Sequence, residues 1–162
     1  ETLKDYKNVE IISKDMRFLN LKSYILNHHY KVVANIPYYL TSLIIRKFLE
    51  TETQPSLMVL TVQKEVAQRI CSRPPKMSLL AVSVQFYAKT KIISYISKRC
   101  FWPSPKVDSA IIKIKPEYDN HKKGVNSNLF FKIAKAGFLQ PRKQLTNNLS
   151  KSLGRSKNQV NF

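Results

Sequence analysis

Two predominantly apolar runs, each followed by a segment of helical periodicity, constrain the fold of this chain more than any other feature. The runs occupy residues 31–34 and 56–62, and apolar side chains then recur at helical spacing through residues 40–48 and 63–71. Consecutive apolar residues are typical of strands that are buried on both faces of a sheet. The alternation of strand and helix therefore predicts an α/β layered fold with a mostly parallel sheet.

The remaining segments extend this pattern. Thr41 or Ser42 is expected to cap the helix after the first run, because hydroxyl oxygens accept hydrogen bonds from the free N–H groups of a first turn. The polar segment 116–128 predicts a linker between a layered part, residues 1–116, and a small helical part, residues 117–162. The further expected elements are a short strand at 9–12, a helix at 77–88, strands at 91–97 and 107–115 that can pair as a hairpin, and helices at 128–139 and 142–153.

The charge balance points to a polyanionic partner. The chain carries 28 Lys and Arg against 10 Asp and Glu, a net charge of +18. A genome rich in Lys and Asn codons explains part of this excess, but it does not explain the scarcity of acids. Nucleic acid is favoured over a membrane, because no stretch reaches 18 apolar residues and no signal-like segment opens the chain.

Other site classes find little support in the sequence. The three glycines allow no phosphate-cradling loop of the dinucleotide or Walker type. The neighbouring His28 and His29 diverge on any regular element and have no Cys or acidic partner at ligand spacing, so we predict no metal site. Cys71 and Cys100 are too few for a disulfide scaffold, which predicts reduced thiols and a cytoplasmic location.

The first apolar run ends in an unusual tetrapeptide, Asn35-Ile36-Pro37-Tyr38. Ligands of open α/β sheets bind beyond the carboxyl ends of the strands. There the amide of Asn35 offers both donors and an acceptor, the segment around Pro37 presents carbonyl oxygens, and the ring of Tyr38 can stack on a heterocycle. The alternative is that Asn35 caps the next helix and the tyrosines belong to the core. These residues alone leave both interpretations open.

A second segment favours the ligand interpretation. Phe101 and Trp102 lie in a proline-rich loop between two expected strands. They can form a hydrophobic plug over the edge of the sheet, or an aromatic wall that faces Tyr38 across a flipped-out base. We favour the aromatic wall.

Four segments, taken together, resemble one protein family. Residues 35–38 resemble the N-[LI]-P-[YF] motif of nucleic-acid adenine N6-methyltransferases, and residues 101–110 resemble the F-x-P-x-P-K-V-D-S-A segment of the rRNA adenine N6,N6-dimethyltransferases. Residues 62–70 and 138–149 resemble that family's V-Q-x-E-V-A-x-R and F-x-Q-R-R-K-T-L-x-N-N-L segments, with Pro141 in place of an arginine. The last segment favours the small-subunit rRNA branch over the macrolide-resistance branch.

The resemblance implies a mechanism and a set of site residues. The family transfers methyl groups from S-adenosylmethionine to the N6 amines of two adjacent adenines. Asn35 and the carbonyl of Ile36 or Pro37 would hold the amine, while Tyr38 and Phe101 would stack on the base. No general base is needed, because the amine becomes acidic as it gains the methyl group.

Further residues follow from the same resemblance. Asp15 matches the aspartate that binds the adenine of the cofactor, although the glycine that precedes it in the family is absent here. Asn35 would also lie against the cofactor. Lys106, Arg142 and Lys143 lie in the matched segments and are expected to contact rRNA or the pre-ribosomal subunit.

The chain departs from the family at its start. It lacks the glycine-rich loop and the acid that binds the cofactor ribose, so the resemblance implies an incomplete Rossmann-like class I methyltransferase sheet, without its first strands, and a small C-terminal helical domain. We expect this fragment to bind the cofactor weakly or not at all and to be inactive alone. The alternatives are a non-catalytic RNA-binding or ribosome-assembly module and an adenine-specific DNA methyltransferase, against which segment 138–149 argues.

The family's strand order, 3-2-1-4-5-7-6, predicts which strand lies at the edge of the sheet. If residues 9–12 form the third strand, then residues 31–34 form the fourth and lie at an open edge. An unpaired strand edge readily pairs with another chain. We therefore expect either that the first residues pack outside their family position, or, preferably, that two chains form a homodimer near Val32 to Ala34.

Overall fold

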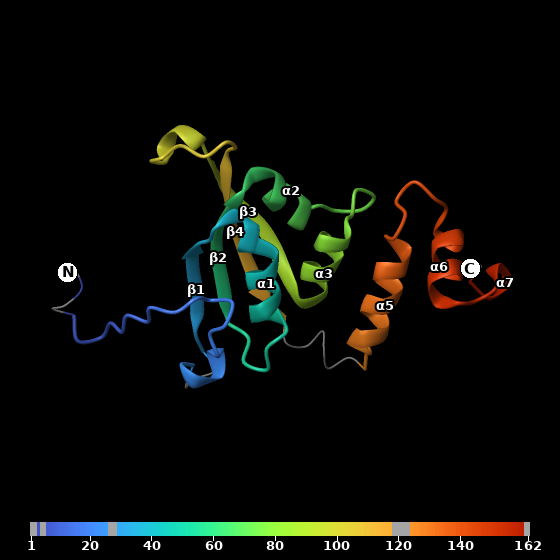
Figure 1. Ribbon diagram of the computed structural model, residues 1–162, viewed down its shortest axis with the longest axis horizontal. Helices are drawn as coiled ribbons and strands as arrows, with labels where there is room; N and C mark the ends of the chain where they lie inside the picture. The colour runs from blue at the N-terminus through green and yellow to red at the C-terminus, as the bar shows by residue number, and fades with distance from the viewer. Residues whose placement is uncertain (1–2, 4–5, 26–28, 118–123, 161–162) are drawn as a thin grey trace.

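The computed structural model describes residues 3, 6–25, 29–117 and 124–160 and is built on one four-stranded sheet (Figure 1). The strands are β1 (Lys31–Asn35), β2 (Leu57–Gln63), β3 (Ala88–Ile96) and β4 (Ser109–Pro116), in the order β1-β2-β4-β3. The β1–β2 pair is parallel, whereas β4 is antiparallel to both β2 and β3. The sheet is therefore mixed rather than mostly parallel. The order β1-β2-β4-β3 corresponds to strands 4-5-7-6 of the order expected from the family. β1 lies at an edge of the sheet, and β3 and β4 pair as a hairpin.

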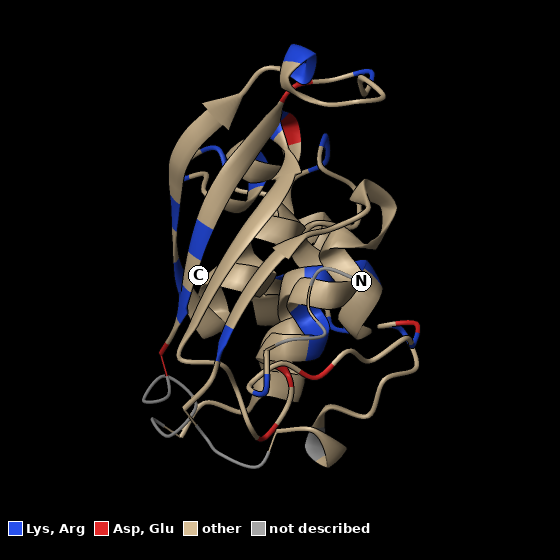
Figure 2. Ribbon diagram, turned by 90° about the vertical axis from the view of Figure 1, so that its left-hand side faces the viewer, with Lys and Arg blue, Asp and Glu red and all other residues tan. Residues whose placement is uncertain are grey.

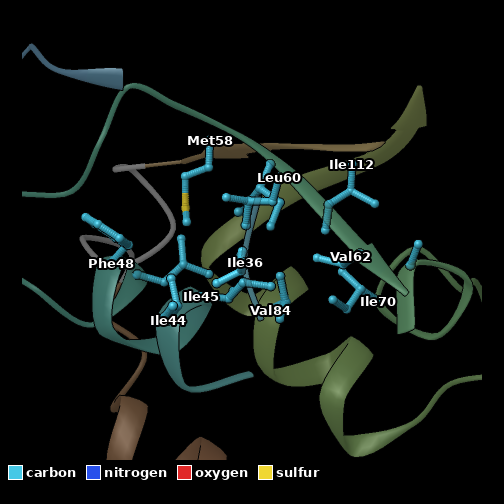
Figure 3. Packing of buried hydrophobic residues seen from close by; sticks show 14 of the residues in the cluster. Ile36, Ile44, Ile45, Phe48, Met58, Leu60, Val62, Ile70, Val84 and Ile112 are labelled. Carbon is cyan, nitrogen blue, oxygen red and sulfur yellow. The ribbon is translucent and has the colours of Figure 1, made fainter. Parts of the chain in front are cut away.

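Helices α1 (Thr41–Leu49), α2 (Lys64–Ile70) and α3 (Leu79–Tyr87) cover one face of this sheet (Figure 1). Buried side chains of β2 and β4, among them Met58, Leu60 and Ile112, point into the same core as Ile45 of α1 and Val84 of α3 (Figure 3). This layer is the main hydrophobic core. It forms because every second residue of β2 and of most of β4 is apolar and fully buried.

No helix of the described chain covers the opposite face of the sheet (Figure 2). Burial consequently alternates along β1 and β2, and Val33 is 80% exposed. The prediction that both apolar runs are buried on both faces is wrong for the residues described, because cover comes from one side alone.

The C-terminal helices α5 (Ser127–Gly137), α6 (Leu145–Leu153) and α7 (Lys157–Val160) form a second, smaller cluster. Ala136, Leu149 and Val160 are its buried hydrophobic residues. The turn before α6 is fixed by Asn148, whose amide donates 2.9 Å hydrogen bonds to the carbonyls of Gly137 and Gln140. Because this turn holds Pro141 and its neighbours, α6 begins three residues later than the pattern predicted.

Two local predictions are wrong. Residues 9–12 form no strand: Ile11 is 72% exposed, and the backbone hydrogen bonds of this segment are local, from the Val9 N–H to the Tyr6 carbonyl and from the Lys14 N–H to the Ile12 carbonyl. Neither Thr41 nor Ser42 caps α1, because a 3₁₀ helix, η2 (Tyr38–Leu40), leads directly into it and Leu40 takes the cap position. Two further 3₁₀ helices are η1 (Leu21–Ser23) and η3 (Lys98–Cys100).

Candidate functional site

A pocket of about 340 Å³ opens at the carboxyl end of β1. It is formed by two segments that are far apart in the sequence, the tetrapeptide after β1 and the loop between β3 and β4. Its lining residues are Asn35, Ile36, Pro37, Tyr38, Phe101, Trp102, Pro103 and Pro105. The fold thus brings together the tetrapeptide and the aromatic loop that the sequence singled out separately.

The tetrapeptide forms a fixed wall because each of its ends is tied to the fold. Asn35 is the last residue of β1 and pairs with Thr61 of β2. Ile36 turns inward and is 5% exposed, packed in the main core (Figure 3). The carbonyl of Pro37 accepts a 2.9 Å hydrogen bond from the N–H of Leu40 and keeps one lone pair for a ligand. This arrangement leaves Asn35 exposed at the pocket with an inflexible backbone beneath it.

Tyr38 is held by a contact that the sequence did not reveal. Its hydroxyl lies 2.7 Å from the Oγ of Ser109, the first residue of β4. Ser109 is fully buried, so the phenol is anchored to the sheet and the ring orientation is restricted. Ser109 belongs to the matched segment 101–110, but nothing in that pattern indicated which side chain it would contact.

The opposite wall is a loop closed by Asp108. One carboxylate oxygen accepts a 3.0 Å hydrogen bond from the N–H of Lys98, at the start of η3. The Asp108 carbonyl accepts from the N–H of Lys64, whose ammonium lies 3.9 Å from the other carboxylate oxygen. The Ser104 hydroxyl adds a 2.9 Å bond to the Lys98 carbonyl. These bonds fasten both ends of the loop that presents Phe101 and Trp102.

The two aromatic residues of the loop differ in exposure. Phe101 is partly buried, whereas Trp102 is 97% exposed at the rim of the pocket. Phe101 and Tyr38 come from opposite walls and make no ring contact in the described part of the chain. The space between the walls suits a flat heterocycle, with an amide and carbonyl oxygens at one end and rings at the sides.

Asp15 does not line this pocket. Its carboxylate is bound by the neighbouring Arg17, with 3.0 and 2.7 Å bonds from Nε and Nη2. The hydrogen bonds from Arg17 lower the pKa of Asp15 below its usual value. The Lys47 ammonium donates to the carbonyls of Met16 and Arg17 and ties this turn to α1. The Asp15 carboxylate, which is expected to bind the adenine of the cofactor, is therefore already paired with Arg17 in this structure.

The expected RNA-binding cations fall in two places. Lys106 is exposed on the loop next to Pro105 of the pocket. Arg142 and Lys143 are exposed in the turn between α5 and α6, on the helical part. Of these three cations, only Lys106 directly follows a residue that lines the pocket.

The described residues form another sizeable cavity besides this pocket. A larger cavity of about 730 Å³ lies between α1, α3 and α5, lined chiefly by Leu49, Val84, Tyr87 and Phe131, with Lys132 and Lys135 among its cationic residues. It contains none of the tetrapeptide or loop residues. Within the described ranges, no three His, Cys, Asp or Glu residues gather as metal ligands would, and none of the helices there has the length and apolar character needed to cross a bilayer.

Comparison with known proteins gives consistent relatives. The family model "Ribosomal RNA adenine dimethylase" matches residues 1–162. "Ribosomal RNA small subunit methyltransferase A" of Dehalococcoides mccartyi strain 195 is 43% identical over 161 residues, covering 99% of this chain and 55% of the relative. The protein of the same name from Fusobacterium nucleatum is 40% identical, covering 95% and 58%. The chain spans about half the length of the curated relatives it matches.

Two solved structures resemble the fold. A dimethyladenosine transferase from Plasmodium falciparum is 28% identical with a TM-score of 0.67, covering 75% of this chain and 44% of that one. The 23S rRNA methyltransferase ErmE reaches a TM-score of 0.74 at 22% identity, covering 93% and 59%. The second likeness bears on the fold alone, and both agree with an incomplete Rossmann-like methyltransferase sheet.

Proposed function

The chain belongs to the ribosomal RNA adenine dimethylase family, and on that premise we propose that it carries the target-base half of an rRNA adenine N6-dimethyltransferase. The observation that supports this most is the meeting of the tetrapeptide and the aromatic loop in one pocket. We further propose residues 1–116 as a partial methyltransferase domain and residues 117–162 as a partial helical RNA-binding domain, supported by the two separate hydrophobic clusters. The substrate would be small-subunit rRNA in the cytoplasm.

In this proposal the chain's own residues bind and orient the target adenine. Tyr38 and Phe101 stack on the two faces of the flipped base. The Asn35 side-chain oxygen and the carbonyl of Ile36 or Pro37 accept the two N–H groups of the exocyclic amine. The amine nitrogen is thereby aimed out of the pocket, and catalysis comes from this positioning and from polar groups that need no rearrangement.

The methyl donor of the proposed reaction is S-adenosylmethionine, and the described residues fit it poorly. The three glycines, Gly124, Gly137 and Gly154, all lie beyond the sheet and outside the pocket lining. The carboxylate of Asp15 is engaged by Arg17. We therefore expect this chain to bind the donor weakly or not at all, which calorimetry with the isolated chain measures. Micromolar binding would contradict this expectation.

Base recognition is tested by comparing two RNAs that differ in one amine. A small-subunit rRNA fragment would carry either adenine or purine, which lacks the N6 amine, at the target position. Because a neutral hydrogen bond contributes about 0.5–1.5 kcal/mol, the chain should prefer adenine by roughly 2- to 12-fold. Asn35→Ala should reduce that preference while leaving affinity for the purine RNA unchanged. Asn147→Ala, on α6, is the matched control and should keep the preference.

The alternative function is a non-catalytic RNA-binding or ribosome-assembly module. The open β1 edge and the engaged Asp15 favour it, because both leave the cofactor side incomplete in the described residues. Equal binding of the adenine and purine RNAs by the unmodified chain would support the module and contradict the target-base proposal. Adenine preference that disappears in Asn35→Ala would support the target-base proposal.

A further inference from the structure

The face of the sheet opposite α1–α3 carries four lysines in two cross-strand pairs. Lys89 lies opposite Lys115, and Lys91 lies opposite Lys113. All four side chains are exposed, while the intervening Thr90 and the flanking residues of β4 are buried toward the helices. Figure 2 shows basic residues along this uncovered face. The alternation of a strand thus places all four ammonium groups on one surface.

This lysine surface has little internal neutralisation. Lys89 forms an ion pair with Glu117, which directly follows β4. Among the described residues, no carboxylate lies within ion-pair distance of Lys91, Lys113 or Lys115. Like charges directly opposite each other destabilise a sheet. An ordinary solvated surface intersperses both signs of charge, whereas these outward positions are all lysine.

The lysine surface shares a row of the sheet with the strand that ends in the pocket. Lys113 pairs across the sheet with Val59 of β2, and Val59 pairs with Val33 of β1. Asn35 lies two residues beyond Val33, about 6.6 Å at about 3.3 Å per residue. One row of the sheet therefore connects the second lysine pair to the strand that ends in the pocket.

We propose that RNA flanking the target base runs across the β3–β4 face, with its phosphates bound by Lys91, Lys113 and Lys115. The inference rests on the proposed function, because the pocket supplies the point where this RNA would be anchored. A nucleic-acid backbone fits the surface because its charges repeat at short intervals, as the paired lysines do. An anionic membrane is the competing occupant and is included in the test.

The test removes two charges from the surface and follows RNA binding against salt. Lys91→Gln with Lys113→Gln keeps the long side chains and removes one lysine from β3 and one from β4. The control is Arg73→Gln with Lys76→Gln, which removes two exposed charges from the loop between α2 and α3. Anisotropy of a labelled single-stranded rRNA fragment would be measured between about 50 and 200 mM salt.

The surface variant should bind more weakly, and its log–log salt slope should fall by about 1.4, since each contact to single-stranded nucleic acid contributes about 0.7. The control should keep the unmodified slope. The thermal midpoint of the surface variant should not fall, because like-charge opposition is relieved. A slope lowered equally in both variants would overturn the proposal, since net charge alone would then explain binding.

Two other outcomes separate this inference from the function it rests on. If the unmodified chain binds RNA with a steep salt slope and the surface variant is unchanged, the inference fails and the proposed function stands. If the unmodified chain shows no salt-dependent RNA binding, both fail. Vesicles with anionic lipid would be tested in parallel, and loss of vesicle binding without loss of RNA binding would assign the surface to a membrane instead.

Discussion

At the scale of single residues, the contact between Tyr38 and Ser109 is the most informative. The hydrogen bond joins the pocket wall to the first residue of β4, and Ser109 has no exposure to water. Ser109→Ala should lower the free energy of unfolding by about 1 kcal/mol, because the phenol hydroxyl loses its buried partner. It should also weaken stacking on the target base, since the ring is no longer held.

A double-mutant cycle with Tyr38→Phe separates this bond from general packing. The two substitutions should couple by about 0.5–1.5 kcal/mol in denaturant unfolding. Additive losses would show that the hydroxyls contribute independently and that Ser109 does not position the ring. Ser152→Ala, which removes an exposed hydroxyl from α6, serves as the comparison.

The sequence pointed to the residues that line the pocket, but not to the residues that hold them in place. Asn35, Tyr38 and Phe101 were chosen for their chemistry, and the fold places them around one pocket. The partners that orient them, Ser109 and Asp108, were not assigned roles, because their contacts span the sheet and the loop and depend on tertiary structure. The cofactor role of Asp15 rests on the family resemblance, in a segment that lacks the family's glycine, and its carboxylate is bound by Arg17.

At the scale of elements, β1 is the strand that most affects the behaviour of the chain. It forms one edge of the sheet, and its central residue, Val33, is 80% exposed. Unpaired edges with exposed apolar residues promote association. We expect the chain to form dimers through β1, and Val33→Lys should shift the population toward monomer. Size-exclusion chromatography with light scattering measures this shift.

The same substitution elsewhere provides the control. Val125 is 49% exposed and lies just before α5, so Val125→Lys should leave the association state unchanged. A purely monomeric unmodified chain would contradict the expectation, and equal effects of both substitutions would attribute it to added charge rather than to the edge.

Elements with strong periodicity were predicted well, and those that depend on neighbours were not. Residues 40–48, 63–71 and 77–88 agree with α1, α2 and α3 to within a few residues, because their apolar stripes face the sheet. Residues 9–12 have strand-like composition, but a strand exists only where another strand pairs with it. The strand order itself came from family resemblance, since local pattern carries no information on which strands are adjacent.

At the scale of the whole molecule, the sheet and the C-terminal helices are joined by aromatic packing. Phe130 of α5 stacks on Phe86 of α3 with ring centroids 4.1 Å apart, and Phe131 packs edge-on against the same ring at 5.2 Å. Phe130→Ala should therefore loosen α5–α7 from the sheet. A Phe→Ala substitution at a fully buried position lowers the free energy of unfolding by about 3–5 kcal/mol. The loss should be smaller here, because Phe130 is only partly buried.

Limited proteolysis measures this uncoupling, with cleavage within α5 expected to accelerate in Phe130→Ala. Leu129→Ala is the control, because Leu129 is adjacent in sequence and 54% exposed. Equal cleavage of both variants would show that the aromatic stack does not hold the helices in place.

Trp102 has a spectroscopic consequence for the whole molecule. It is the one tryptophan of the chain, and it is 97% exposed at the rim of the pocket. Indole emission therefore reports on the pocket and hardly at all on the core. Denaturant should change the emission wavelength little, because the ring is already in water when the chain is folded. Bound RNA should quench or shift it strongly, so the unmodified chain carries its own optical probe for the site.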